Sequence, residues 1–236
     1  MTESVCAAPD NTLRAEQPQQ LLDLLRQIII SSSLHDGGPH GMDHSERVLN
    51  AALFLGNRLD ANLHILAAAA LLHDIGRKEE SASKGGICHA KRGAELARPI
   101  LQGLHYKEED IASICHAIAA HRYRGGIKPL TLEASILFDA DKLDSIGAVG
   151  IGRAFLFAGK IGARLHNPDL DHGTTKSYSE EDTAYREFVV KLSRVKELML
   201  TPLGRQLAQE RHAFMLTFFD QLTREVAGFP ATLSPQ

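Results

Sequence analysis

The sequence predicts an all-α protein, a compact bundle of several helices around one central, buried helix. Residues 63–72 are almost entirely apolar, so a helix there would be hydrophobic on every side and would have to lie in the core. Most other segments repeat apolar residues at the i, i+3, i+4, i+7 spacing of a helix with one buried face. No segment shows the alternation that would predict a strand.

Length and composition favour one domain in a reducing compartment. The chain has 236 residues, 44% of them hydrophobic, which suffices for a sizeable core. A net charge of −3 gives no basic field to attract a nucleic-acid polymer or an anionic membrane. The three cysteines lack CxxC spacing, and no apolar run reaches membrane-spanning length. We therefore expect a cytoplasmic protein that binds neither a nucleic-acid polymer nor a membrane. The sequence predicts no particular oligomeric state.

The N-terminal part of the chain is expected to hold two helices before the central one. Residues 1–19 are expected to form a flexible lead-in, followed by a helix over 21–30 with helical apolar spacing. Ser, Gly and Pro mark a loop over 31–43. Asp43 is expected to cap the N-terminus of a helix from about 44 to 59.

The middle of the chain is expected to alternate helices and polar loops. The central helix is predicted over 61–75, with Gly76 ending it as a C-terminal glycine does. A polar loop should lead to a helix over 89–101, which Pro99 would kink or end. A further helix is expected over 107–122.

The remaining chain is expected to add one helix to the core and two beyond it. Thr131 begins a helix that reaches about residue 147, where three closely spaced glycines indicate a tight helix junction. Residues 160–182 read as a polar loop. Two amphipathic helices, over about 183–200 and 203–227, close the chain, and Pro202 separates them.

Four polar side chains are predicted to point into the core from three helices. His44 shares a helix face with the apolar Val48, His73 and Asp74 end the buried helix, and Asp141 lies on an apolar stripe. Such groups are costly to bury without partners. They form either a buried ion pair or a set of two imidazoles and two carboxylates for one divalent ion, which Mn, Fe, Ni, Mg or Co would all suit.

In this order the motifs resemble the HD superfamily of metal-dependent phosphohydrolases, and in particular its small stand-alone bacterial branch. The matching segments are MDHSERV (42–48), LLHDIGR (71–77), CHAKRGAELA (88–97), ICHAIAAH (114–121) and FDADKLDSIG (138–147). The resemblance implies one HD-type domain over 20–228, with a core of about 25–160 and a C-terminal helical extension over 183–227.

The resemblance also implies a reaction and its ligands. It assigns the metal ligands to His44, His73, Asp74 and Asp141. The expected activity is hydrolysis of a nucleotide or another small phosphate ester or anhydride by attack of metal-bound water, because a divalent ion acidifies water and polarises a phosphoryl group. The expected partner is thus a small phosphorylated compound, and nucleotides are the first class of compound to test.

Two-metal members of this family carry two further histidines between the HD pair and the last aspartate. His89 matches the first, and His121 is preferred over His116 for the second because the helical wheel places it nearer the core. The alternative is a single metal with His89 and His121 binding substrate or only packing. The segment HRYRGGIKP lacks the GYP triplet of relatives that act on cyclic dinucleotides.

Charged residues next to the ligands are candidates for the catalytic machinery. Arg47, Arg77 and Lys142 are expected to bind phosphate oxygens. The alternative for Arg47 is an ion pair with Asp43 or Glu46, and the alternative for Arg77 and Lys142 is a solvated surface charge. Asp74 is expected to hold the metal and its water, and Asp144 to orient a ligand or a water. Two other functions stay open on the same fold: a di-iron oxygenase and a non-catalytic nucleotide sensor.

Overall fold

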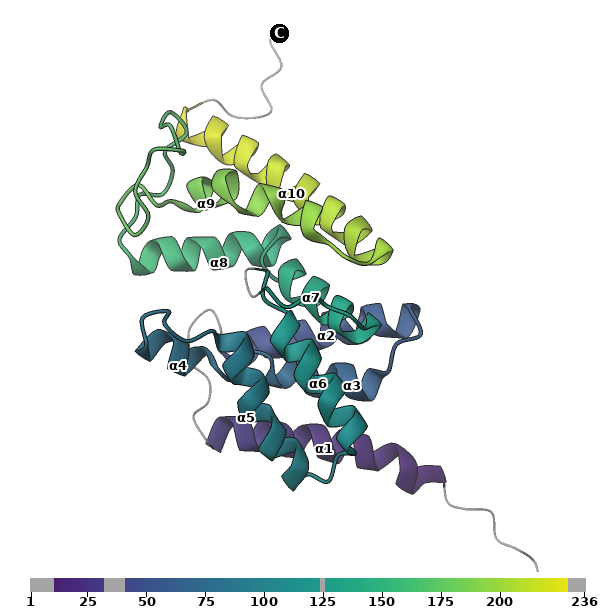
Figure 1. Cartoon of the computed structure of the whole chain (residues 1–236). Helices are drawn as coiled ribbons and strands as arrows, with labels where there is room; N and C mark the ends of the chain where they lie inside the picture. Colours follow the sequence, from purple (N-terminus) through teal and green to yellow (C-terminus); the bar gives the residue numbers. More distant parts are fainter. Residues whose placement is uncertain (1–10, 32–40, 124–125, 229–236) are drawn as a thin grey trace, which may run out of the picture.

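A computed structural model describes residues 11–31, 41–123 and 126–228, and within these residues the chain is helical and contains no strand. The all-α prediction is therefore confirmed. The elements, in order, are α1 (Asn11–Ser31), α2 (Met42–Arg58), α3 (Leu63–Leu72), α4 (Arg77–Ala82), α5 (His89–Gly103), α6 (Glu108–Ala120), α7 (Leu132–Leu143), α8 (Gly147–Lys160), α9 (Ala184–Val190), the 3-10 helix η2 (Leu192–Leu198) and α10 (Pro202–Val226). Figure 1 shows α1–α7 forming one body and α8–α10 stacked on its α7 side.

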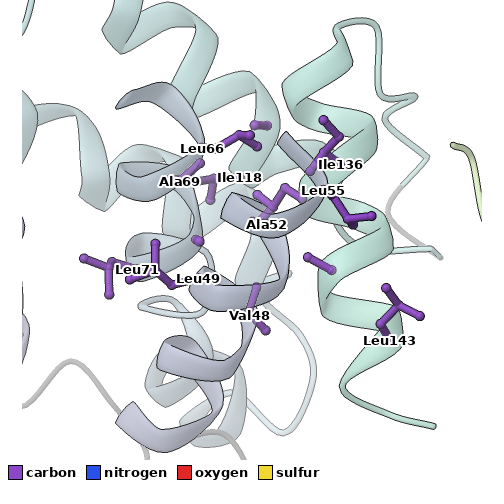
Figure 2. Packing of buried hydrophobic residues seen from close by; sticks show 14 of the residues in the cluster. Val48, Leu49, Ala52, Leu55, Leu66, Ala69, Leu71, Ile118, Ile136 and Leu143 are labelled. Atoms are coloured by element: carbon purple, nitrogen blue, oxygen red, sulfur yellow. The ribbon is translucent and has the colours of Figure 1, made fainter. Parts of the chain in front are cut away.

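Helix α3 is the centre of the first body, as its apolar sequence predicts. Every residue from Ile65 to Leu72 is buried, and the helix packs against α1, α2, α6 and α7. Figure 2 shows Leu66 and Ala69 of α3 gathered with Ile118 of α6 and side chains of α2 and α7. The Asn62 side chain caps α3 by accepting hydrogen bonds from the two amides of His64 and Ile65.

The end of α3 differs from the prediction. The helix stops at Leu72, and residues 73–76 form a turn into α4, where the sequence predicted a polar loop. Gly76 has φ −84°, so it is not a left-handed C-terminal glycine. A Cβ at Gly76 would lie 2.3 Å from the carbonyl oxygen of His89, so the glycine is needed because the backbone of α5 approaches closely.

Other predicted boundaries also shift. Asp43 lies inside α2, which is preceded by Gly41 rather than capped by Asp43. Helix α1 begins at Asn11, ten residues before the predicted start, whereas residues 1–10 and 32–40 of the predicted lead-in and loop lie outside the described residues. Helix α5 continues past Pro99 to Gly103.

The C-terminal third holds two elements that the sequence did not predict. The three glycines at 147, 150 and 152 belong to a helix, α8, where the prediction placed only a junction. The helix predicted over 183–200 is instead divided at Lys191 into α9 and η2. In the part of the chain that the structure describes, every helix is too short or too polar to span a bilayer.

A buried carboxylate anchors the C-terminal elements to the first body. Asp139, two residues before Asp141 on α7, is fully buried beneath the η2–α10 connection. Its oxygens accept hydrogen bonds from Leu200 N at 2.8 Å and from Thr201 N and Oγ1 at 2.8 and 2.7 Å. Gly204 makes room for it, because a Cβ there would lie 2.2 Å from Asp139 Oδ2.

Replacing Asp139 with alanine should destabilise the protein by about 2–4 kcal/mol, because buried backbone and hydroxyl donors lose a charged acceptor. Urea unfolding monitored by circular dichroism measures the change. Asp220→Ala is the matched control, since that carboxylate is exposed on α10 and pairs with the exposed Arg224; it should change stability by less than about 0.5 kcal/mol. Equal effects of the two variants would contradict the anchoring role.

Candidate metal centre

Six histidine and aspartate side chains from five helices converge on one buried point. His44 lies in the first turn of α2, and His73 and Asp74 follow α3 directly. The list is completed by His89 at the start of α5, His121 at the end of α6 and Asp141 in α7. All but Asp141 are less than 3% exposed. The largely apolar helices therefore bring polar side chains together inside the protein.

The first group of donors is formed by His44, His73 and Asp141, joined by one oxygen of Asp74. His44 Nε2 lies 3.2 Å from His73 Nε2 and 3.3 Å from Asp141 Oδ1. Asp74 Oδ2 lies 3.7 Å from His44 Nε2 and 3.6 Å from His73 Nε2. These separations suit ligand atoms arranged around one small ion at roughly 2.0–2.2 Å.

The second group uses the other oxygen of the same carboxylate. His89 Nε2 and His121 Nε2 are 3.2 Å apart, and each lies 3.6 Å from Asp74 Oδ1. His116, the alternative considered from sequence, lies elsewhere and accepts a hydrogen bond from Leu130 N at 3.0 Å. Asp74 therefore sits between two pairs of imidazoles, with one oxygen toward each pair.

Backbone carbonyls fix the orientation of two of these imidazoles. His73 Nδ1 lies 2.7 Å from Ala70 O, and His121 Nδ1 lies 2.6 Å from Ile118 O. A carbonyl oxygen can only accept, so each Nδ1 must carry the hydrogen. When such a ring is neutral, its Nε2 presents a lone pair to the centre of the cluster.

Carboxylates play the same part for the other two imidazoles. His44 Nδ1 donates to Asp144 Oδ2 at 2.7 Å, and His89 Nδ1 donates to Glu80 Oε2 at 2.9 Å. A hydrogen-bonded Nδ1 with Nε2 directed inward is the arrangement of metal-ligating histidines. Two Nε2 lone pairs that face each other at 3.2 Å repel, and a cation between them removes the repulsion. The residues present therefore fit a divalent metal.

Burial and neighbouring charges shift the pKa values of several donors in this cluster. Burial lowers the pKa of His73 to about 3 and that of His89 to about 4, so both rings are neutral at neutral pH. Burial also lowers the pKa of His44, but hydrogen bonds to Asp141 and Asp144 outweigh it and raise the value. Burial favours the neutral form of Asp141, yet Lys142 and His44 hold its pKa well below the ordinary value.

The three cations predicted to bind phosphate all contact carboxylates of the cluster. Arg77 Nε donates to Asp74 Oδ1 at 2.9 Å, and Lys142 Nζ lies 2.6 Å from Asp141 Oδ2. Arg47 donates twice to Asp144, from Nε at 2.6 Å and from Nη2 at 3.0 Å. Burial alone would raise the pKa of Asp144, but hydrogen bonds from His44 and Arg47 and the nearby charge of Arg153 lower it to about 2.

A hollow of about 440 Å³ opens directly onto His44. Its walls are the first turns of α2 and one face of α8, and the lining residues are Asp43, His44, Arg47, Val149, Gly152, Arg153, Leu156 and Lys160. Arg153 also donates to Asp144 Oδ2 at 2.6 Å. We call this space the cationic hollow, because three positive side chains line it beside His44.

Sequence reasoning missed Arg153, Lys160 and Glu80. The first two share a face of α8 with Val149 and Leu156, a helical spacing that the closely spaced glycines concealed. Glu80 lies on α4, which was predicted as a loop, and only the folded chain brings it to His89. A signal for α8 was available in the apolar residues that recur through 147–160.

Comparison with known proteins agrees with the fold and the donor set about the class of protein. That class is a hydrolase-type domain that binds a divalent metal. The HD domain family matches residues 41–146. The uncharacterized protein YpgQ of Bacillus subtilis (strain 168) is 34% identical over 224 residues, which cover 93% of this chain and 98% of YpgQ. The chain belongs to the HD superfamily, as its motifs indicated.

Solved structures agree with this assignment. The crystal structure of YpgQ matches with a TM-score of 0.68 at 31% identity, over 89% of this chain and 98% of YpgQ. YpgQ has also been crystallised in complex with ADP, with a TM-score of 0.67 at 29% identity and the same coverage. An HD-superfamily hydrolase from Bacillus thuringiensis matches with a TM-score of 0.68 at 27% identity, over 90% of this chain and 98% of that one.

A more distant relative is much longer than this chain. Ribonuclease Y of Chloroflexus aurantiacus is 31% identical over 169 residues, which are 70% of this chain but 28% of that enzyme. The chain therefore corresponds to less than a third of ribonuclease Y.

Adding Mn²⁺ to metal-stripped protein should raise the melting temperature by about 5–10 °C at a concentration 100-fold above Kd, because the ion binds the folded state alone. Differential scanning fluorimetry measures the shift. His73→Ala should abolish it, whereas His64→Ala, an exposed histidine on the same helix, should keep it. An undiminished shift in the His73 variant would contradict the metal centre.

Proposed function

We propose that the protein is a metal-dependent phosphohydrolase whose substrate is a nucleotide. The observation that carries this proposal is the position of the cationic hollow, which shares His44 with the donor cluster. A divalent ion beside positive side chains is the combination that phosphoryl transfer requires. The hollow would therefore bring the phosphate to the place where the ion is bound.

We further propose that the cluster would hold two ions, with Asp74 contributing one carboxylate oxygen to each group of donors. His44, His73 and Asp141 would bind the first, and His89 with His121 the second. Support comes from the facing pairs of Nε2 atoms, 3.2 Å apart in each group, and from the two oxygens of Asp74 directed one toward each pair. Bound ions would acidify water and polarise the phosphoryl oxygen.

The surrounding side chains would position the substrate and the ligands. Arg47, Arg153 and Lys160 would bind phosphate oxygens with charge-assisted hydrogen bonds. Asp144 would hold His44 in the tautomer that presents Nε2, and it would keep the two arginines at the wall of the hollow. Arg77 and Lys142 would stabilise the charged carboxylates of Asp74 and Asp141.

A nucleotide is proposed as the substrate for two reasons. YpgQ, which is similar over nearly its whole length, has been crystallised in complex with ADP. In addition, the hollow of about 440 Å³ exceeds the space that a lone phosphate group needs and falls in the range of small-molecule sites. A two-metal donor set also suits two irons, but three cations at its entrance favour phosphate over dioxygen chemistry.

A phosphate-release screen over ribonucleotides and deoxyribonucleotides, with Mn²⁺, Mg²⁺, Co²⁺, Ni²⁺ or Fe²⁺, tests the function. At least one pairing should be active, and Asp74→Asn should lower kcat about 1,000-fold because it removes the bridging charge. Glu187→Gln, a carboxylate change on α9 away from the cluster, should leave kcat within about twofold. No phosphate release from any nucleotide would reject the proposal.

Lys160→Met should raise KM about tenfold and change kcat by less than about threefold, because it removes one contact to a phosphate that does not react. Lys191→Met is the control, an exposed lysine that pairs with Glu187 outside the hollow. Steady-state kinetics on the substrate found in the screen measures both. Equal KM values for the two variants would remove Lys160 from the substrate site.

Element analysis of purified protein tests the ion count. The unmodified protein should carry two ions per chain, and His121→Ala should carry one, because the second group loses half of its imidazoles. His116→Ala, on the same helix but hydrogen-bonded to Leu130 N, should keep two. A single ion in both the unmodified protein and the His121 variant would favour the one-metal alternative.

A further inference from the structure

A second hollow adjoins the cationic hollow and is different in character. It has a volume of about 350 Å³, lies between the start of α8 and the middle of α10, and is lined by Ile146, Gly147, Ala148, Val149, Glu210, Arg211 and Phe214. We call it the Phe214 hollow. Val149 lines both spaces, so one ligand can extend from one hollow into the other across this side chain.

The Phe214 hollow has the chemistry of a site for an aromatic ring. Its walls are mainly apolar, and Phe214 is 50% exposed, although exposing a large aromatic side chain to water is unfavourable. Phenylalanine is the side chain on which nucleobases stack. At the rim, the exposed carboxylate of Glu210 can accept a hydrogen bond from a ring N–H or an amino group.

Arg211 ties this hollow to the metal centre. Its Nη1 donates to the carbonyl oxygen of Leu143, the residue before Asp144, which in turn orients His44. The side chain is held in place because Gly147 leaves room for it: a Cβ at Gly147 would lie 2.9 Å from Arg211 Cγ. Gly147 has φ +74°, a conformation that favours glycine. The apolar wall is therefore fixed relative to the donor cluster.

We propose that the Phe214 hollow binds the nucleoside part of the substrate, with the base stacked on Phe214. The phosphates would pass Val149 and lie in the cationic hollow against His44. This inference rests on the proposed function and deepens it. Each hollow falls in the range of volumes of small-molecule sites, and the pair provides an apolar aromatic end and a cationic end, as a nucleotide does. The C-terminal helices would thus select for a base.

Calorimetric titration with α,β-methylene-ADP and with methylenediphosphonate, both with Mg²⁺, tests the proposal without requiring hydrolysis. The two probes share the bridged phosphonate chemistry and differ in the nucleoside. The unmodified protein should bind the nucleotide analogue more tightly. In Phe214→Ala the ratio of the two affinities should fall about tenfold, the expected effect of losing one stacking interaction.

Leu216→Ala is the matched control, because Leu216 is 51% exposed on the same helix and lines neither hollow. It should leave the ratio within twofold. An unchanged ratio in Phe214→Ala, or an equal loss for both probes, would overturn the nucleoside site. So would a dimer, seen by analytical ultracentrifugation, that Phe214→Ala dissociates with no change in the ratio, since a second copy would then occupy the hollow.

The phosphate-release screen separates this inference from the proposed function. If nucleotides are hydrolysed but the ratio of affinities is unchanged in Phe214→Ala, the function stands and the nucleoside site is rejected. If the ratio falls as expected but no nucleotide is hydrolysed, the nucleoside site is supported and the phosphohydrolase is rejected.

Discussion

The carboxylate of Asp74 lies between two pairs of imidazoles, and the packing of the surrounding helices brings these groups together. One oxygen lies 3.6–3.7 Å from the Nε2 atoms of His44 and His73, and the other lies 3.6 Å from those of His89 and His121. A charged carboxylate with no exposed surface is stable only among compensating charges and donors. Arg77 supplies part of that compensation, and bound cations would add to it. The site is therefore a buried cluster of charged and polar groups whose charges must be balanced. Its catalytic activity would depend on the ions that bind there.

Close packing of backbones brings the donors to this point. The buried residues of α3 allow the surrounding helices to approach from several sides, and the turn after α3 meets the first turn of α5 without intervening side chains. Gly93 contributes to the same contact as Gly76, because a Cβ there would lie 3.2 Å from the carbonyl oxygen of His73. Side chains at either position would push α5 outward and separate His89 from Asp74. Packing in the core thus sets distances between ligands, which is a stricter requirement than burial alone.

The C-terminal elements complete the site from outside the core. Asp144 is the junction, since it accepts hydrogen bonds from His44 on one side and from Arg47 and Arg153 on the other. Helix α8 brings Arg153 to that carboxylate. Asp139 anchors the connection between η2 and α10 by accepting a hydrogen bond from Thr201 N. One wall of the cationic hollow therefore comes from α2 and the other from α8, whereas the donor residues lie on α2–α7 and the turns that follow these helices. Changes in α8 would therefore alter the hollow while leaving the donors in place.

The sequence alone determined the all-α fold, the central helix and the inward direction of His44 and Asp141, because helical periodicity is a local property of the chain. Helix ends were less well predicted: the glycine after α3 was read as a helix terminator when it serves a contact with a distant backbone. Only the tertiary structure showed which groups Glu80, Arg153 and Phe214 lie beside. Each of these residues meets its partners across helices far apart in sequence, and no spacing along the chain records which helix faces which. Local patterns fix what one helix buries, whereas the packing of all the helices decides which groups share a site.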